Sequence, residues 1–192
     1  MKKFLISIFA IFLIVGCSNE ETKENVEKVE DEVEVVEEVV EIPEVERLYL
    51  DVIRTSYETL SESLGIIQEK FAEAEADNSV LVEQEWRNTV RGEFMRLSLS
   101  YALLTEMRNN NDVPVGYEEL HQAVEDAFKT YSEAGVVIME VVDNDVVAMS
   151  QLKEGSDLMS EANEKVVKST ELFLEEVNKF KNWCWQANKF VI

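Results

Sequence analysis

After residue 43, the apolar residues of the chain recur at steps of three and four, which places them on one face of an α-helix. Four such stretches follow one another, and we expect helices over 44–76, 79–108, 117–142 and 145–182. The apolar stripes of the first two begin at Val45 and Val82. Clusters of Asp, Asn, Ser and Pro separate the stretches, and these residue types favour helix caps and turns. The pattern predicts an all-α fold.

The connections between the four stretches are short, and short connections favour antiparallel neighbours. We therefore predict an antiparallel up-down-up-down four-helix bundle. Only 6 Gly and 2 Pro occur in 192 residues, which argues against an all-β fold with its many turns. Gly155 lies inside the fourth stretch and leaves a break in that helix open, because glycine weakens a helix interior.

The first 17 residues have a pattern of their own. Lys2 and Lys3 precede an almost unbroken apolar run, which ends in Ile14-Val15-Gly16-Cys17. A positive head, an apolar run and a small residue at the end are the parts of an export signal. A run of about 12 apolar residues is short for a bilayer crossing, which needs about 20. An uncleaved anchor with an incidental cysteine is therefore the weaker alternative.

This segment resembles a bacterial lipoprotein signal peptide, and Ile14-Val15-Gly16-Cys17 resembles its lipobox. The resemblance implies a diacylglycerol on the Cys17 thiol, cleavage between Gly16 and Cys17, and acylation of the new amino terminus. It also implies a place at the extracytoplasmic face of the cell membrane, with the membrane as one partner. In composition and architecture the chain is similar to the small helical lipoproteins common in low-GC Gram-positive bacteria.

Residues 17–43 are expected to form the lipidated cysteine and an acidic, flexible tether. Residues 18–43 hold 11 acidic residues against Lys23 and Lys28 and no aromatic residue, a composition typical of a solvated linker. Five valines at alternating steps of three and four form a short a/d seam: Val26, Val29, Val33, Val36 and Val40. Because the seam covers barely two heptads, a pairing helix is the alternative to a free tether.

The net charge of the chain is −22. Loss of Lys2 and Lys3 with the signal leaves 16 basic against 40 acidic residues, a net charge of −24. A surface this acidic repels nucleic acid and attracts cations, so no nucleic-acid partner is expected. Cys184 has no second cysteine to pair with once Cys17 carries lipid, so it is either a free thiol or pairs between chains.

The C-terminal end differs from the acidic remainder, because no acidic residue occurs in 178–192. In the predicted topology this end lies beside the tether, and residues 183–192 form a separate aromatic and basic tail. Candidate membrane-facing residues are Lys179, Lys181, Trp183, Trp185, Lys189 and Phe190. Alternatively, Phe180 and the tryptophans cap the core while the lysines complement the helix dipole.

One motif suggests metal chemistry, because Glu118 and His121 form Glu-x-x-His on a predicted helix. A ferritin-like di-iron site needs two such motifs, and His121 is the single histidine of the chain. Zinc would also lack its usual ligands. We therefore expect no metal, no cofactor and no catalytic residue. Glu118 and Glu119 are expected to be first-turn acids, and His121 a surface or boundary residue.

The sequence thus favours a membrane-anchored lipoprotein that acts as a non-enzymatic structural or protein-interaction module with an unidentified protein partner. The alternative is a module that binds a small ligand or a divalent cation between the helices. Polar residues on or beside the apolar stripes would mark such a site, namely Ser56, Ser63, Ser156 and Thr170.

Overall fold

The computed structural model of the chain describes residues 42–143 and 149–180. The described residues form four α-helices, and a short 3-10 turn joins the first two. The elements are α1 (Glu44–Ala76), η2 (Asn78–Val82), α2 (Gln84–Asn110), α3 (Glu118–Asp143) and α4 (Met149–Asn178). No strand occurs in these two ranges, so the prediction of an all-α fold is confirmed. The signal segment, the tether and residues 181–192 lie outside the described residues.

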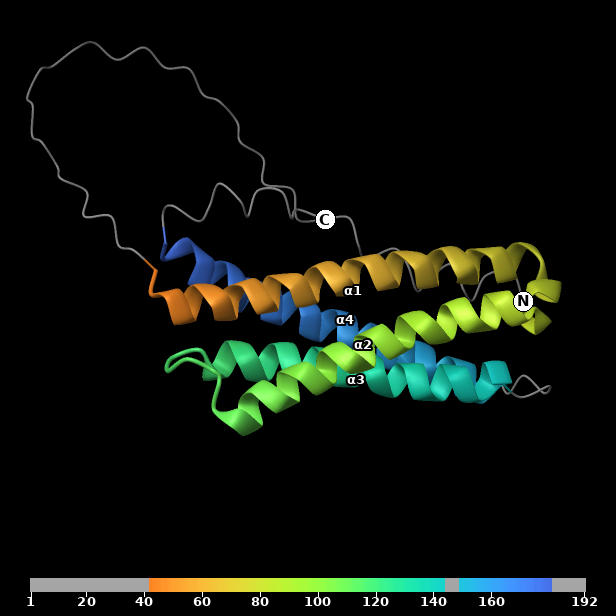
Figure 1. Ribbon diagram of the computed structural model, residues 1–192. Helices are drawn as coiled ribbons and strands as arrows, with labels where there is room; N and C mark the ends of the chain where they lie inside the picture. Colours follow the sequence, from red (N-terminus) through yellow and green to blue (C-terminus); the bar gives the residue numbers. More distant parts are fainter. Residues whose placement is uncertain (1–41, 144–148, 181–192) are drawn as a thin grey trace, which may run out of the picture.

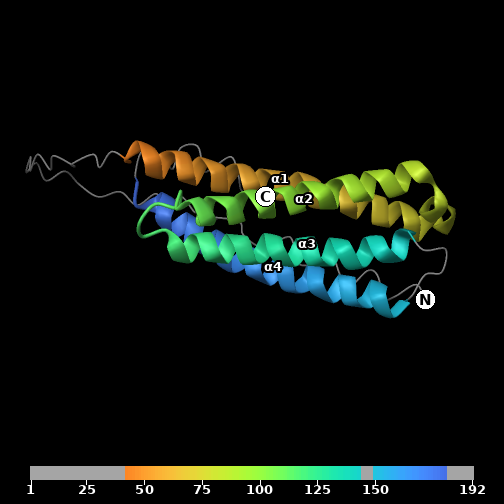
Figure 2. The ribbon, with the colours of Figure 1, turned by 60° about the horizontal axis from the view of Figure 1, so that its bottom comes forward.

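The four helices are long rods that lie side by side (Figures 1 and 2). Consecutive helices are packed together, and α3 lies against both α2 and α4. Figure 1 shows the start of α1, the loop between α2 and α3, and the end of α4 at the same end of the molecule. Within the described residues, none of the helices combines the length and the apolarity that a membrane crossing requires.

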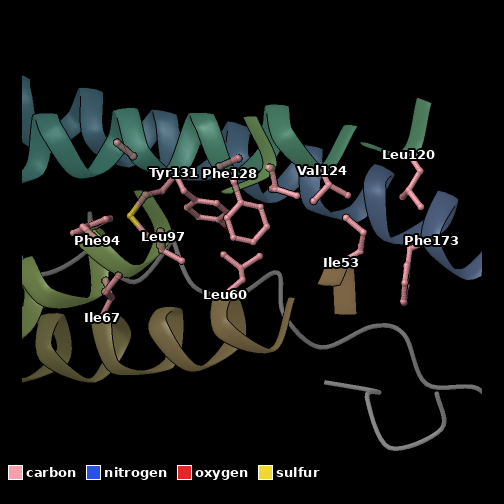
Figure 3. Packing of buried hydrophobic residues seen from close by; sticks show 14 of the residues in the cluster. Ile53, Leu60, Ile67, Phe94, Leu97, Leu120, Val124, Phe128, Tyr131 and Phe173 are labelled. Atoms are coloured by element: carbon pink, nitrogen blue, oxygen red, sulfur yellow. The ribbon is translucent and has the colours of Figure 1, made fainter. Parts of the chain in front are cut away.

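The core is centred on α3, in which 13 of 26 residues are buried. Phe128 and Tyr131 are fully buried, and Figure 3 shows their rings reaching toward Leu60 of α1 and Leu97 of α2. The predicted stripe of α3 accounts for this face, since its apolar residues recur at steps of three and four from Leu120 onward. Helix α3 therefore contributes the centre of the core, against which side chains of the other three helices pack.

Two glycines allow the helices to approach α3 closely. A Cβ atom on Gly135 of α3 would lie 2.7 Å from Cδ1 of Phe94 in α2. A Cβ atom on Gly155 of α4 would lie 2.6 Å from Cγ1 of Ile138 in α3. Helix α4 continues through Gly155 without a break. This glycine is therefore a packing residue and does not end the helix.

The connection between α1 and α2 corrects the sequence-based bounds, because the second helix begins at Gln84 and not at residue 79. The carboxylate of Asp77 accepts a hydrogen bond from the backbone N–H of Ser79 at 2.9 Å, and this cap stabilises the 3-10 turn in place of a first turn of α2. Val82 ends that turn and is 73% exposed, so it does not belong to the inner stripe. Val45, in the first turn of α1, is 65% exposed and likewise does not belong to the inner stripe.

The remaining helix ends follow the expected chemistry. Asn111 has a left-handed conformation (φ 60°), and its N–H reaches the carbonyls of Met107 and Arg108, which closes α2. Helix α4 ends at Asn178, so the expected extension of this helix to residue 182 is wrong. Phe180, beyond the helix, is buried. The burial of Phe180 agrees with its placement as a cap of the core.

Substitution of the contact glycines tests the close approach of the helices. We expect Gly135→Ala and Gly155→Ala each to lower the free energy of unfolding by about 1–3 kcal/mol, because the new methyl group overpacks a filled core. The matched control is Gly65→Ala, where a Cβ atom would meet nothing within 4 Å. This change should raise stability by about 0.5–1 kcal/mol through helix propensity. Urea unfolding measures all three, and equal effects at the three positions would contradict the packing.

Candidate functional site

A cluster of polar side chains lies at the end of the bundle where α1 and α3 begin and α2 ends. The hydroxyl of Tyr117 donates to the carboxylate of Glu46 at 2.8 Å. The ring of Tyr117 also contacts that of Tyr49 edge to face, with centroids 5.3 Å apart. These contacts join the loop before α3 to the first turns of α1.

His121 is the centre of this cluster, and it is only 2% exposed. Its Nε2 lies 2.9 Å from the carbonyl oxygen of Leu104, so Nε2 carries the proton and donates. Its Nδ1 lies 3.3 Å from the hydroxyl of Tyr49, which donates to it. Burial raises the pKa of Tyr49 and lowers the pKa of His121, so a neutral tyrosine meets a neutral imidazole.

Glu125 lies one helical turn after His121 and is equally buried. Its two carboxylate oxygens accept hydrogen bonds from the hydroxyl of Thr105 and from Nη1 of Arg108, each at 2.7 Å. Both partners come from α2. A buried carboxylate is costly unless it is paired and hydrogen-bonded, and here both conditions are met.

This cluster therefore contributes to packing, and the expectation that His121 is a surface or boundary residue is wrong. The backbone carbonyl of Leu104 and the hydroxyl of Tyr49 satisfy the imidazole, which explains why a polar ring is tolerated inside the bundle. Glu118, the other member of the Glu-x-x-His motif, accepts a hydrogen bond from the N–H of Gly116 at 2.9 Å. Among the described residues, no group of three or more His, Cys, Asp and Glu side chains is placed to hold a metal ion.

The four hydroxyl residues proposed for a site between helices lie on α1 (Ser56 and Ser63) and on α4 (Ser156 and Thr170). Ser56 donates to the carbonyl of Val52 in its own helix at 3.0 Å. Ser63 is fully buried, and its Oγ has no hydrogen-bond partner among the described residues. Ser156 and Thr170 are half-buried on α4.

A separate contact links α1 to α4, because the hydroxyl of Tyr57 donates to Ser169 at 2.8 Å. The ring of Tyr57 also contacts that of Phe173 edge to face. Burial raises the pKa of Tyr57 to about 12, so the hydroxyl stays protonated as a donor. This contact links α1 to α4, the helix farthest from it in the sequence.

The second candidate site is an exposed apolar surface on α2, which we call the outer stripe. It consists of Met95, Leu99 and Leu103, which are 58%, 67% and 47% exposed. Residues four apart lie on one face of a helix, while Leu97 and Leu99 point about 200° apart. Since Leu97 is fully buried, Leu99 faces directly away from the core. Helix α2 is therefore apolar on two opposite faces.

Two arginines lie beside the outer stripe. Arg91 is four residues before Met95 and pairs with Asp143 of α3, while Arg96 is three residues before Leu99. Arg96 pairs with Glu62 of α1 at 2.9 Å. Helix α2 carries four arginines against three glutamates, whereas each of the other three α-helices has an excess of acidic residues. The outer stripe is thus the apolar surface of the one described helix with a basic excess.

Most site residues expected from the sequence lie outside the described residues, namely Gly16, Cys17, Lys181, Trp183, Trp185, Lys189 and Phe190. Lys179 is described, is exposed, and pairs with Glu176 in the preceding turn. Sequence reasoning missed the outer stripe and the buried Glu125. The four-residue spacing of Met95, Leu99 and Leu103 was a signal for the former.

Comparison of the chain with protein-family models, with curated proteins and with solved structures gave no match. The candidate sites are therefore interpreted from the residues of this chain alone.

The neutral state of His121 predicts a pH dependence of stability. Its pKa is lowered in the folded chain and close to 6.5 in the unfolded chain, so the unfolded chain binds a proton first as the pH falls. The stabilisation is complete above about pH 6.5 and is lost as the pH falls toward the folded pKa.

The His121→Gln variant isolates this effect, because its amide can donate to Leu104 and accept from Tyr49 but does not titrate. The difference in unfolding free energy between the two chains should change between pH 7.5 and pH 5, with the His121 chain losing more. Urea unfolding at several pH values measures it, and a pH-independent difference would refute the assignment. The carboxylates common to both chains cancel in the difference.

Proposed function

We propose that the protein is a lipoprotein anchored at the extracytoplasmic face of the cell membrane, where its bundle acts as a non-enzymatic structural or protein-interaction module. Residues 1–16 are the signal peptide, and the lipid on Cys17 is the anchor. The bundle is an antiparallel up-down-up-down four-helix bundle. The start of α1 and the end of α4 lie at the same end of the molecule in Figure 1, which supports this topology.

The outer stripe of α2 is the observation that carries the interaction function. Helices at the surface of a soluble bundle are normally polar on the side away from the core. Three large apolar side chains in succession on that side, each about half exposed or more, form a surface that a partner can bury (Met95, Leu99 and Leu103).

The buried polar residues support a non-enzymatic function. His121 and Glu125 are the chemically most versatile side chains in the core, and both take part in hydrogen bonds that join α3 to α2. A catalytic base needs a side chain that is free to exchange a proton with a substrate. These two residues are instead part of the packing.

A second candidate function is the binding of a small ligand or divalent cation between the helices. Ser63 Oγ favours it, because a buried hydroxyl without a hydrogen-bond partner among the described residues is uncommon. Ser63 lies on the buried face of α1. A ligand bound to it would therefore lie in the core and not on the outer stripe.

Metabolic labelling with a radioactive fatty acid tests the anchor. The unaltered chain should incorporate the label, and Cys17→Ala should lose it because the acceptor thiol is gone. Cys184→Ala is the matched control, since it removes the other cysteine and should leave labelling unchanged. A label that survives in Cys17→Ala, or that is absent from the unaltered chain, would refute the lipoprotein assignment.

A photoreactive amino acid at position 99, introduced in living cells, tests the interaction function. Irradiation should give one discrete protein adduct at this position, because a bound partner would lie against the outer stripe. Val167 on α4 is the control position, as it is 54% exposed and lies outside the stripe. Equal adducts at positions 99 and 167 would count against a specific contact.

A further inference from the structure

The outer stripe of α2 is an exposed apolar surface of the kind that a partner or another segment of the chain can bury. A surface helix normally has polar residues on the side away from the core, and the outer stripe departs from that pattern. The inner face of α2 is covered by the rest of the bundle, but Leu99 on the outer face is 67% exposed. Val45 and Leu48, in the first turns of α1, are also exposed. Helix α1 begins at the end of the molecule where α2 ends (Figure 1).

The chain contains a segment whose pattern matches this surface. Residues 26–40 carry the a/d seam of five valines, and most of their other residues are acidic. As a helix they would be about 22 Å long, which exceeds the rise of about 12 Å from Leu103 to Met95. The valines would meet the apolar stripe, and the glutamates beside them would meet Arg91 and Arg96.

The point where this segment joins the bundle lies at the end of the molecule where α2 ends (Figure 1). Ile42 packs against the core, and Pro43 is extended with φ −54° and ψ 139°. A residue before proline is disfavoured in a helix, so residues 26–40 cannot continue α1 as one rod. Connections of two to five residues join antiparallel helices. Figure 1 shows that α1 begins at the end of the bundle where α2 ends. A reversal within 41–43 would therefore bring residues 26–40 alongside both helices.

We infer that residues 26–40 fold back as an amphipathic helix and cover the outer stripe of α2. The register places Val40 near Leu103 and Val36 near Leu99. The tether is then not only a spacer, because an external partner of the stripe has to displace this segment first. The inference uses the stripe of the proposed function but does not depend on lipidation.

Other occupants fit less well. The C-terminal tail carries Lys181 and Lys189 and no acidic residue, so it would bring like charge to Arg91 and Arg96. A second copy of the chain would bring a net charge of −22 against an equal charge. Residues 26–40 combine an apolar seam, the opposite charge and a short connection.

Disulfide trapping tests the inference in the full chain with Cys17→Ser and Cys184→Ser, purified in a mild detergent. Val36→Cys is combined with Leu99→Cys or, as the matched control, with Val167→Cys on the exposed side of α4. We expect the 36–99 disulfide to form within one chain at least about tenfold faster than the 36–167 disulfide, because docking raises the local thiol concentration. Equal rates would overturn the inference, and a disulfide between chains would assign the stripe to a second copy instead.

Hydrogen exchange provides a second measurement that needs no introduced cysteine. Amides of residues 26–40 should exchange more slowly in the unaltered chain than in a Leu99→Asp variant, which keeps the core intact because Leu99 is exposed. Equal and fast exchange in both would overturn the inference. If trapping and exchange both fail while position 99 still captures a protein in cells, the proposed function stands and only the fold-back of the tether is wrong.

Discussion

The close packing of α3 against its two neighbours is the contact on which the rest of the bundle depends. Gly135 admits the ring of Phe94 from α2, and Gly155 of α4 admits Ile138 from α3. Each of these close contacts needs a residue without a Cβ atom. Both involve α3, which has the most buried residues among the described helices. Helix α1 then closes the core through contacts with α2 and through the Tyr57 hydrogen bond to Ser169.

The charged residues of neighbouring helices complement one another. The acidic helices α1 and α3 lie on either side of α2, and the arginines of α2 reach both: Arg96 pairs with Glu62, and Arg108 with the buried Glu125. Pairing with α2 offsets part of the repulsion that a net charge of −22 would otherwise produce between neighbouring helices. The arginines therefore have a structural reason to occur on α2, and they also give the outer stripe its basic border.

The positions of the helices can be predicted from the sequence. The contacts that a side chain makes with residues distant in the sequence cannot. The spacing of apolar residues predicts a helix over 44–76, and α1 spans Glu44–Ala76. The predicted start of α2 is too early, because a hydrogen bond from the N–H of Ser79 to the carboxylate of Asp77 stabilises a 3-10 turn before the helix. His121 was misjudged because its partners, Leu104 and Tyr49, are 17 and 72 residues away. The outer stripe of α2 was not predicted from the sequence, although its three residues recur at steps of four.

The central claim is that the outer stripe of α2 is covered in the native protein, and Met95 is a natural probe of it. Met95 is 58% exposed, while Met159 is 6% exposed in the core. Thioether oxidation by peroxide follows exposure. If the stripe is covered, Met95 in the full chain should oxidise nearly as slowly as Met159 and become fast in urea. Rapid oxidation of Met95 in the folded full chain, with Met159 protected, would contradict the account.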